Sequence, residues 1–420
     1  MAADDKAQRP LDALNFFLAD VRDGLGPYLA IYLLIIERWD EASIGTVMSI
    51  AGVAGILAQT PAGALIDATK AKRAIIIAAA ILVTLGSIVL PLAPNFLFVA
   101  ATQAVTGVAG SIFPPAIAAI TLGIVGQKAF AARTGRNEAF NHAGNAVAAT
   151  LAGTFAYYFG PSVVFWLMAA MGLASIFATL SVPAHAIDHD VARGLEANGH
   201  TGLDSRLGDA TDKPSGFRIL LTCRPLLIFA IATVIFHFSN AAMLPLVGQK
   251  LALVNRELGT TLISVCIVAA QLVMVPVALL VGAKADVWGR KPIFAVALAV
   301  LAVRGALYPL SDDPYWLIGV QLLDGVGAGI FGALFPLVVA DLTRGTGHFN
   351  ISQGAIATAA GLGAALSTFV AGWIIVAAGY SAAFLFLAGI AGAGLALFVI
   401  AMPETAPHIS TQDPAAVPVR

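Results

Sequence analysis

The sequence predicts an all-α membrane protein with twelve transmembrane helices in two parallel six-helix repeats. Three observations predict this fold. Of the 420 residues, 59% are hydrophobic and only 11% are charged, and the mean hydropathy is +0.88. Soluble proteins are roughly 45–50% apolar and about 25% charged. The apolar residues gather into twelve segments of membrane-spanning length. The second half of the chain also repeats features of the first half.

Each apolar segment is expected to be a helix, because backbone polar groups in lipid must pair within their own segment. A membrane β-barrel is not indicated, because its strands would show alternating polarity. Pro- and Gly-containing stretches separate several of the segments. The expected spans are residues 14–37, 44–66, 74–93, 96–125, 138–160, 162–183, 220–247, 258–283, 292–311, 314–340, 350–378 and 381–402.

One long polar stretch divides these spans into two groups of six. Residues 184–217 contain many charged and few large apolar side chains, so we interpret them as a mobile cytoplasmic linker. It joins an N-terminal six-helix bundle, residues 14–183, to a C-terminal one, residues 218–403. Short cytoplasmic tails, residues 1–13 and 404–420, are expected at the two ends.

Basic residues predict the orientation in the membrane. Of the 23 Lys and Arg residues, 18 fall in the termini and in the loops on the same side, three lie on the opposite side and two lie inside spans. Cytoplasmic loops carry an excess of Lys and Arg. Both termini and the linker are therefore expected in the cytoplasm, as an even number of spans also requires.

The composition excludes several classes of protein, namely soluble enzymes, nucleic-acid-binding, disordered and fibrous proteins. The net charge of −1 gives no long-range attraction to nucleic acid. Cys223 and Cys266 lie in apolar runs without the spacing of a metal or redox site, so we expect ordinary core thiols. The pattern contains no metal-ligand, nucleophile or nucleotide-binding constellation. We expect no cofactor, no metal and no enzymatic activity.

The two halves match at an offset of 219 residues. Matching pairs include Gly63 with Gly282, Asp67 with Asp286, Lys72 with Lys291, Gly144 with Gly363, Gly153 with Gly372, Gly160 with Gly379 and Phe165 with Phe384. Small residues within spans allow helices to approach closely. Because each half has an even number of spans, the repeat is parallel, and such repeats place a binding site between the halves near the middle of the membrane.

The most specific motif is the loop between the second and third helices of each half. The first copy contains Gly63, Asp67, Lys72 and Arg73, and the second contains Gly282, Asp286, Arg290 and Lys291. This loop resembles the signature loop of the major facilitator superfamily, and the resemblance extends over nearly the whole chain. It implies a secondary transporter, most similar to bacterial drug and metabolite efflux permeases. It also implies a monomer, a small-molecule substrate and a bacterial inner membrane.

The chemistry of this loop suggests a conformational role. An Asp at a helix end is stabilised by the positive N-terminus of a neighbouring helix and by a basic turn. By the resemblance, Asp67 and Asp286 are latches that form in one orientation of the cavity and break in the other. The first copy has Lys70 where the second has Gly289, so its turn is expected to differ. A purely topogenic basic loop is the alternative.

Helix 1 contains ionisable residues, which are costly inside a membrane and therefore indicate function. Asp20 and Asp23 share one helical face, and Arg22 lies between them. The resemblance implies that helix 1 lines the central cavity, so either carboxylate is a candidate proton carrier. In the alternative interpretation, Arg22 neutralises one Asp and the group stabilises the helix.

Helix 5 carries a polar stripe that includes Asn141, His142 and Asn145 on one face. These side chains are candidates for hydrogen bonding to substrate. His142 is also a candidate for proton movement, because histidine is the side chain that most readily exchanges a proton at physiological pH. Hydrogen bonds between helices are the alternative role for the whole stripe.

Polar residues of the second half form a further group of candidates. We place His237, Asn240 and Gln271 near the substrate cavity, on helices 7 and 8. Asp324 in helix 10 and Arg304 in helix 9 both lie near mid-depth and are predicted to form a charge pair. We favour a structural or gating pair over a direct substrate or proton site.

Two departures from the family pattern bear on function. Proton-coupled members often have an Arg in helix 4, and Gln103 stands at the similar position here, with Gln321 in the other half. The Gly-Pro pattern of drug antiporters in helix 5 is absent. We favour a proton-coupled exporter of small organic solutes. A proton-linked uptake symporter or a facilitator for a nutrient or organic acid is the alternative, and a non-transporting sensor with the same fold is a further one.

Overall fold

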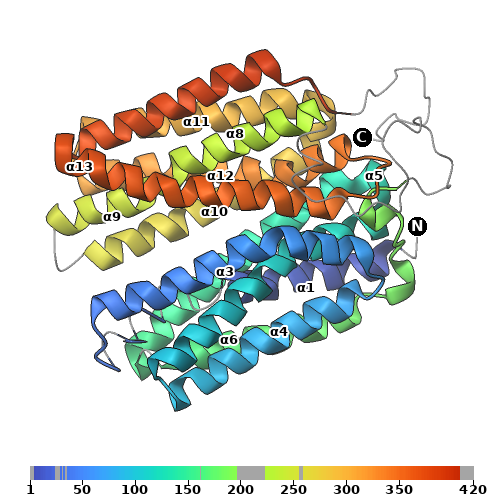
Figure 1. Ribbon diagram of the computed structural model, residues 1–420, viewed down its shortest axis with the longest axis horizontal. Helices are drawn as coiled ribbons and strands as arrows, with labels where there is room; N and C mark the ends of the chain where they lie inside the picture. Colours follow the sequence, from blue (N-terminus) through green and yellow to red (C-terminus); the bar gives the residue numbers. More distant parts are fainter. Residues whose placement is uncertain are drawn as a thin grey trace.

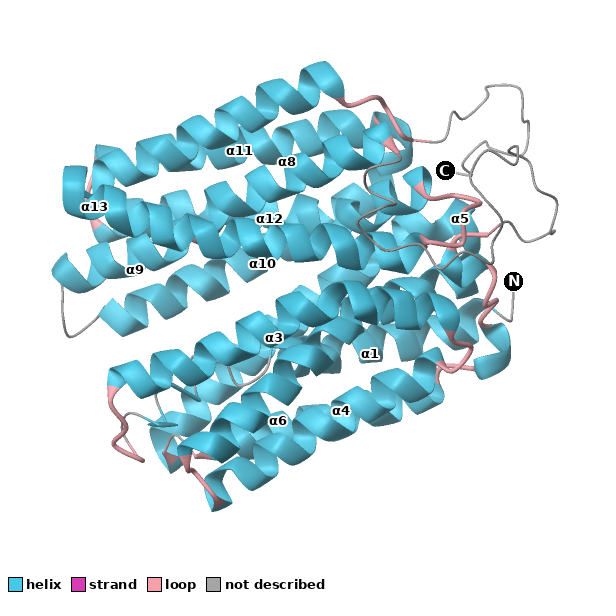
Figure 2. Ribbon diagram, viewed as in Figure 1, coloured by secondary structure: helices cyan, strands magenta, loops and turns pink. Residues whose placement is uncertain are grey.

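A computed structural model shows a bundle of long helices (Figures 1 and 2). It describes residues 4–23, 29–30, 32–33, 36–160, 162–195, 223–254 and 259–406. The described chain begins and ends at the same end of the bundle, which we call the terminal face (Figure 1).

The first half of the chain supplies five long helices. They are α1 (Asp4–Asp23), α3 (Glu41–Ala68), α4 (Lys72–Val89), α5 (Phe96–Phe159) and α6 (Val163–Ser181). The second half supplies α8 (Arg224–Ala241), α9 (Met243–Val254), α10 (Gly259–Trp288), α11 (Arg290–Leu307), α12 (Pro314–Leu342) and α13 (Phe349–Ala401). Short 3-10 turns are η1 (Leu90–Leu92), η2 (Ala184–Ala186), η3 (Val191–Arg193) and η4 (Tyr308–Leu310).

These helices overlap the twelve expected spans, but α1 begins at Asp4, so much of the expected N-terminal tail is helical. Within the described residues, nine helical stretches are long and apolar enough to cross a membrane, with α8 and α9 forming one of them. Two of the nine, α5 and α13, turn sharply at Gly126 and Gly379 and each contain two segments. With α1 added, twelve helices result. The prediction of an all-α membrane protein is confirmed, and the described part of the chain contains no strand.

The fifth helix begins earlier than its apolar span, which we placed at residues 138–160. The second segment of α5 starts directly after Gly126, whose φ of 67° reverses the chain. The intervening residues include several polar side chains, and helical backbone extends beyond the apolar run where such side chains find partners. Arg133 and Arg136 do so, because both bind Asp12 of α1.

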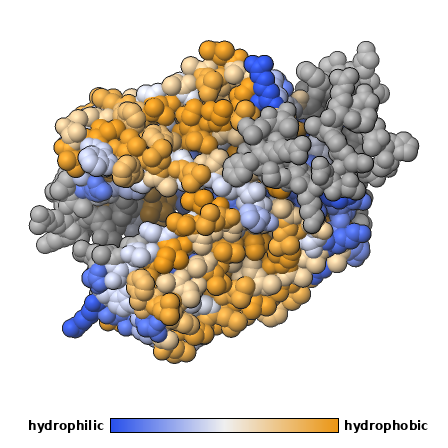
Figure 3. Space-filling view, viewed as in Figure 1, coloured by the Kyte–Doolittle hydropathy of each residue, from blue (hydrophilic) through white to orange (hydrophobic). Residues whose placement is uncertain are grey.

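The two halves form two bodies side by side, and each has its own apolar core. In Figure 1, helices α1, α3, α4 and α6 of the first half lie below helices α8 to α13 of the second half. Apolar side chains cover most of the outer surface that is visible in Figure 3, and hydrophilic side chains gather toward the two ends. This surface suits a multi-pass membrane protein, because lipid tails contact its middle and water contacts its ends.

The internal repeat is visible in the backbone. Gly160, at the end of α5, has φ 82° and ψ 168°, and its repeat partner Gly379 has φ 84° and ψ 174°. Positive φ values of this kind are accessible to glycine at little cost. In both halves the fifth helix therefore joins the sixth through the same glycine turn.

The linker is folded over its first part, which the sequence did not predict. Residues 184–195, the strap, run across the terminal face. Asp188 N donates to Gly123 O of α5 at 3.0 Å, and Gly345 N, before α13, donates to Gly194 O at 2.6 Å. The strap thus contacts both halves. The rest of the predicted linker, residues 196–217, lies outside the described residues.

Candidate functional site

The two halves touch closely near the terminal face, where glycines of one half meet backbone of the other. A side-chain Cβ at Gly63 of α3 would overlap the backbone at Asn350 of α13, and one at Gly354 would overlap Gln59 O. A Cβ at Gly135 of α5 would lie 2.5 Å from Ala278 O of α10. Such contacts require glycine because no side chain fits between the helices.

These contacts obey the internal repeat. Gly63 and Gly282 are repeat partners, and so are Gly135 and Gly354, at the same offset of 219 residues. In each case the second helix of one half crosses the fifth helix of the other half. The eight residues of α13 from Phe349 to Ile356 are all buried. The terminal face is therefore closed between the halves.

The opposite ends of the same helices are less crowded. A Cβ at Gly153 of α5 or at Gly372 of α13 would meet nothing within 4 Å. These two glycines are also repeat partners. Glycines of α5 and α13 are thus enclosed by the other half at the terminal face and have open space at the opposite end.

Asp67 connects the two halves at the terminal face. Its Oδ1 accepts from Asn350 N at 3.2 Å and from Asn350 Nδ2 at 2.8 Å, and its Oδ2 accepts from Ile351 N at 2.8 Å. The first backbone N–H groups of a helix have no partner inside the helix. A carboxylate satisfies them and also complements the positive end of the helix dipole. Asp67 thus caps α13 from across the interface between the halves.

Asp286, the repeat partner of Asp67, makes a different contact. Its carboxylate pairs with Arg290 Nη1 at 2.7 Å within the same half, and Arg290 Nε also binds Asp341 at 3.0 Å. The reason is that the two repeat-related helices begin at different positions. Helix α13 begins at Phe349, which matches residue 130 of the first half, but the second segment of α5 already begins at residue 127. The N–H groups that would match those bound by Asp67 already lie inside a helix. The latch is therefore one-sided in this arrangement.

The basic residues of the two loops bind helix ends within their own halves. Arg73 Nη2 donates to Leu180 O at the end of α6 at 2.7 Å. Lys72 Nζ donates to Thr69 O at 2.7 Å. In the second copy, the N–H groups of Arg290 and Lys291 donate to the Glu404 carboxylate. Burial alone would raise the pKa of Glu404, but its backbone hydrogen bonds lower it below the ordinary value.

The strap carries charged side chains and a histidine to the latch. Asn350 Nδ2 donates both to Asp67 and to Ala192 O of the strap, the latter at 3.0 Å. Burial lowers the pKa of His348, at the start of α13, and Arg193 of the strap lowers it further. Burial also lowers the pKa of His189 in the strap, as do the ammonium groups of Lys72 and Lys70, against the opposing carboxylates of the strap.

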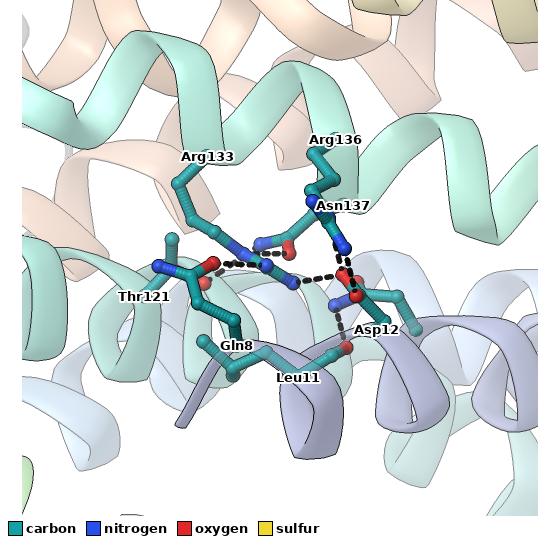
Figure 4. A network of polar contacts seen from close by, with 8 residues as sticks. Gln8, Leu11, Asp12, Thr121, Arg133, Arg136 and Asn137 are labelled. Atoms are coloured by element: carbon teal, nitrogen blue, oxygen red, sulfur yellow. Dashed lines mark hydrogen bonds and ion pairs between the residues drawn. The ribbon is translucent and has the colours of Figure 1, made fainter. Parts of the chain in front are cut away.

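A second polar network lies wholly inside the first half (Figure 4). Asp12 of α1 accepts from Arg133 Nη2 at 2.8 Å and from Arg136 Nε at 2.9 Å. Arg133 Nε donates to Asn137 Oδ1 at 2.9 Å, and Asn137 Nδ2 donates to Thr121 at 2.8 Å. The network fixes the start of α1 against both segments of α5. The sequence pattern missed it, because Asp12 lies in the part interpreted as a tail.

A third network occupies the middle of the second half. Arg304 of α11 is buried, pairs with Asp324 of α12 and donates to Asn240 of α8 at 2.7 Å. Gln321 Nε2 donates to Asp324 Oδ2 at 3.0 Å, and Tyr308 OH donates to Gln321 Oε1 at 2.5 Å. The structure thus brings Arg304, Asp324 and Asn240 together, whereas the sequence pattern gave no indication of Tyr308.

Among the described residues, a hydrogen bond joins the polar stripe of α5 to the other half. His142 Nδ1 and Gln271 Oε1 of α10 lie 2.8 Å apart. Asn141 Nδ2 donates to Glu138 at 3.3 Å in its own helix, and Asn145 is half-buried. His237 is placed elsewhere, with its Nδ1 3.1 Å from Thr233 O and its ring 4.8 Å from that of Phe331.

The helix 1 candidates cannot be placed as side chains. Asp20, Arg22 and Asp23 lie on α1, but their side chains fall outside the described part of the structure. Their proposed role in proton movement stays a prediction.

A cavity of about 390 Å³ lies between the two halves. Its walls come from α3 and α5 of the first half and from α12 and α13 of the second. Its polar lining residues are Gln59, Gln103, Thr106, Ser111 and Gln353. The remaining lining residues are small or apolar, among them Phe335 of α12. None of the described residues around it carries an ionisable side chain.

Comparisons with known proteins agree with this architecture. The family model of the Major Facilitator Superfamily matches residues 12–303 and 229–419. Two relatives, from the CDC 1551 and H37Rv strains of Mycobacterium tuberculosis, are each called an uncharacterized MFS-type transporter. Each is 61% identical over 405 residues, which span 96% of this chain and 95% of the relative.

Two solved structures resemble the fold. The human organic anion transporter MFSD10 (TETRAN) gives a TM-score of 0.71 over 94% of this chain and 99% of its own. The nucleoside transporter NupG gives 0.63 over 94% of this chain and 100% of its own. Each is 15% identical to this chain, so these similarities bear on the fold alone.

Proposed function

Because this chain belongs to the major facilitator superfamily and is thus a multi-pass membrane transporter, we propose that it moves a small organic solute by alternating access. In such a mechanism two halves rock about a central site, which opens to one side of the membrane at a time. The closed terminal face, the cavity between the halves and the open space at the opposite ends of α5 and α13 support this proposal.

The observation that carries the proposal is the capping of α13 by Asp67. The bonds join one half to the other, so they must break when the terminal face opens. They form a discrete contact that favours one of two arrangements, as a latch requires. By the charge distribution of the loops, the terminal face is cytoplasmic. The described arrangement is then the outward-facing state, and the bacterial inner membrane is the proposed location.

We also propose that protons drive the cycle and that solute is exported. The candidate proton carriers are Asp20 and Asp23, because a membrane-embedded carboxylate indicates function. Asp324 is assigned a structural role, because its carboxylate is already bound by Arg304 and Gln321. The described cavity lining contains no carboxylate that competes for this role.

The test is transport in sealed proteoliposomes that contain a trapped pH dye. Wild type, Asp20→Asn, Asp23→Asn and Asp67→Ala are compared with a panel of organic cations, sugars and organic acids. We expect solute movement with a pH change in the wild type and loss of the pH change in one helix 1 variant. Asp67→Ala is expected to slow transport, because the closed terminal face loses its latch.

Three other outcomes of this experiment would each contradict a different part of the proposal. Solute movement without any pH change contradicts proton coupling and indicates a facilitator. Accumulation driven by an inward proton gradient contradicts export and indicates uptake. Absence of solute movement across the whole panel contradicts transport and favours the sensor alternative.

A further inference from the structure

We propose that three glutamine side chains, Gln59, Gln103 and Gln353, form a binding site for an uncharged, hydrogen-bonding solute. The inference rests on the proposed transport function and specifies its substrate class. The three residues belong to α3, α5 and α13, so both halves contribute to the site. All three residues line the cavity between the halves, whose volume of about 390 Å³ lies in the range of small-molecule pockets.

One of these side chains, Gln59, has a buried hydrogen-bonding group, Oε1, without a partner among the described residues. Gln103 is only 6% exposed and lines the cavity. Buried polar groups are nearly always paired, because an unpaired group loses its hydrogen bonds to water. A ligand in the cavity offers a partner to the Gln59 oxygen and also meets Gln103, which lines the same cavity.

The chemistry of the lining selects against charge. Each carboxamide presents a donor and an acceptor side by side and carries no net charge. A charged solute in this cavity would meet no counter-ion among the described lining residues, and desolvating an unpaired ion is expensive. An uncharged solute with adjacent donors and acceptors pairs with the carboxamides at no such cost. Hydroxyl, amide and nucleobase groups have this pattern.

The remaining lining residues favour a solute with a flat or narrow face. Phe335 contributes an aromatic ring, and the α3 and α5 walls contain glycines. Gly107 packs so closely on Ala51 O that no side chain fits there. On the α3 and α5 side of the cavity, the polar lining residues are Gln59, Gln103, Thr106 and Ser111, and the other lining residues are small or apolar.

Gln353 also connects the site to the latch. Its Nε2 donates to Asn350 Oδ1 at 3.3 Å, and Asn350 Nδ2 donates to Asp67. A solute that draws the Gln353 carboxamide into the cavity competes for this bond. Solute binding is thereby linked to the contact that closes the terminal face.

The experiment measures concentration-dependent transport of single probes by the full-length protein in proteoliposomes. The uncharged probes are uridine, glucose and nicotinamide, and the charged probes are tetraphenylphosphonium and benzoate. Wild type is compared with Gln103→Leu and with Gln103→Glu, which adds charge at almost constant shape. Gln249→Leu is the matched control, because Gln249 does not line this cavity and accepts a hydrogen bond from Tyr380. Thermal unfolding in detergent verifies that each variant is folded.

We expect transport of at least one uncharged probe and of neither charged probe. Gln103→Leu is expected to raise KM about tenfold, as the loss of one well-placed hydrogen bond predicts. Gln103→Glu is expected to lose transport at neutral pH, whereas Gln249→Leu behaves as wild type. A folded Gln103→Leu variant with unchanged KM overturns the inference, and so does transport of charged probes alone. In both cases the proposed transport function stands, whereas no transport of any probe contradicts that function itself.

Discussion

At the scale of single residues, the buried pair of Arg304 and Asp324 gives a direct prediction about stability. Removing one member leaves an uncompensated charge inside the bundle, which costs about 3–5 kcal/mol. We therefore expect Asp324→Leu to lower the thermal stability in detergent strongly. The double variant Arg304→Leu and Asp324→Leu is expected to recover part of the loss, because no unpaired charge remains. A double variant less stable than the sum of the single effects would contradict this account.

Sequence reasoning reached some of these residues and missed others for a physical reason. Arg304 and Asp324 were paired correctly, because charges at similar depth in a membrane seek each other. The partner of Asp67 was expected to be a helix N-terminus, but the pattern gave no way to choose α13. Of the three cavity glutamines only Gln103 was noticed, as a departure from a family pattern, whereas Gln59 and Gln353 were missed. Convergence of side chains from α3, α5 and α13 depends on helix packing between the halves, which spacing along one helix does not encode.

At the scale of elements, the strap is expected to respond to pH. When the strap is docked, the pKa values of His189 and His348 are lowered, so both histidines are held neutral. Once released, they titrate near their ordinary value of roughly 6.5. The docked strap therefore binds fewer protons, and docking is strongest above pH 6.5 and weakens as the pH falls below that value.

Hydrogen exchange of the strap amides measures this response. After correction for intrinsic rates, we expect faster exchange below about pH 6.5 than above it. A variant with both His189→Gln and His348→Gln is expected to lose most of this difference, while Arg193 and the strap carboxylates remain as in the wild type. Greater protection of the strap in acid would contradict the sign of the effect.

The hydropathy pattern predicts some helix boundaries and misses others. Each expected apolar run overlaps a described helix, because lipid contact demands apolar side chains. The start of the fifth helix was misplaced, since Arg133 and Arg136 are stabilised outside the apolar run by Asp12, which is distant in sequence. The strap was missed for a similar reason. Its bonds to Gly123 and Gly345 are backbone bonds, which leave no composition signal.

At the scale of the whole molecule, the repeat predicted the architecture but not the conformational state. Matching glycines and loops indicated two similar halves, and the paired crossings of α3 with α13 and of α5 with α10 follow that repeat. The same transporter sequence must be compatible with both orientations of the cavity. The sequence pattern therefore does not tell which orientation the structure shows. The closed terminal face emerges only from packing, and the one-sided latch reflects a small difference in where two repeat-related helices begin.

The central claim is that the halves rock about the cavity and that Asp67 holds the terminal face closed. Electron spin resonance distances between spin labels on the two halves test it most directly. One label pair, at Lys70→Cys and Arg344→Cys, reports on the terminal face, and another, at Leu92→Cys and Tyr315→Cys, reports on the opposite face. Each pair is measured in the wild type and in Asp67→Ala.

A second pair of variants separates closure from general damage. Gly135→Val places a side chain where α5 meets α10, and Gly153→Val makes the same change in open space on the same helix. We predict that Asp67→Ala and Gly135→Val lengthen the terminal-face distance and shorten the opposite one, whereas Gly153→Val changes neither. Unchanged distances in Asp67→Ala and Gly135→Val, or movement of both pairs in the same direction, would contradict the account.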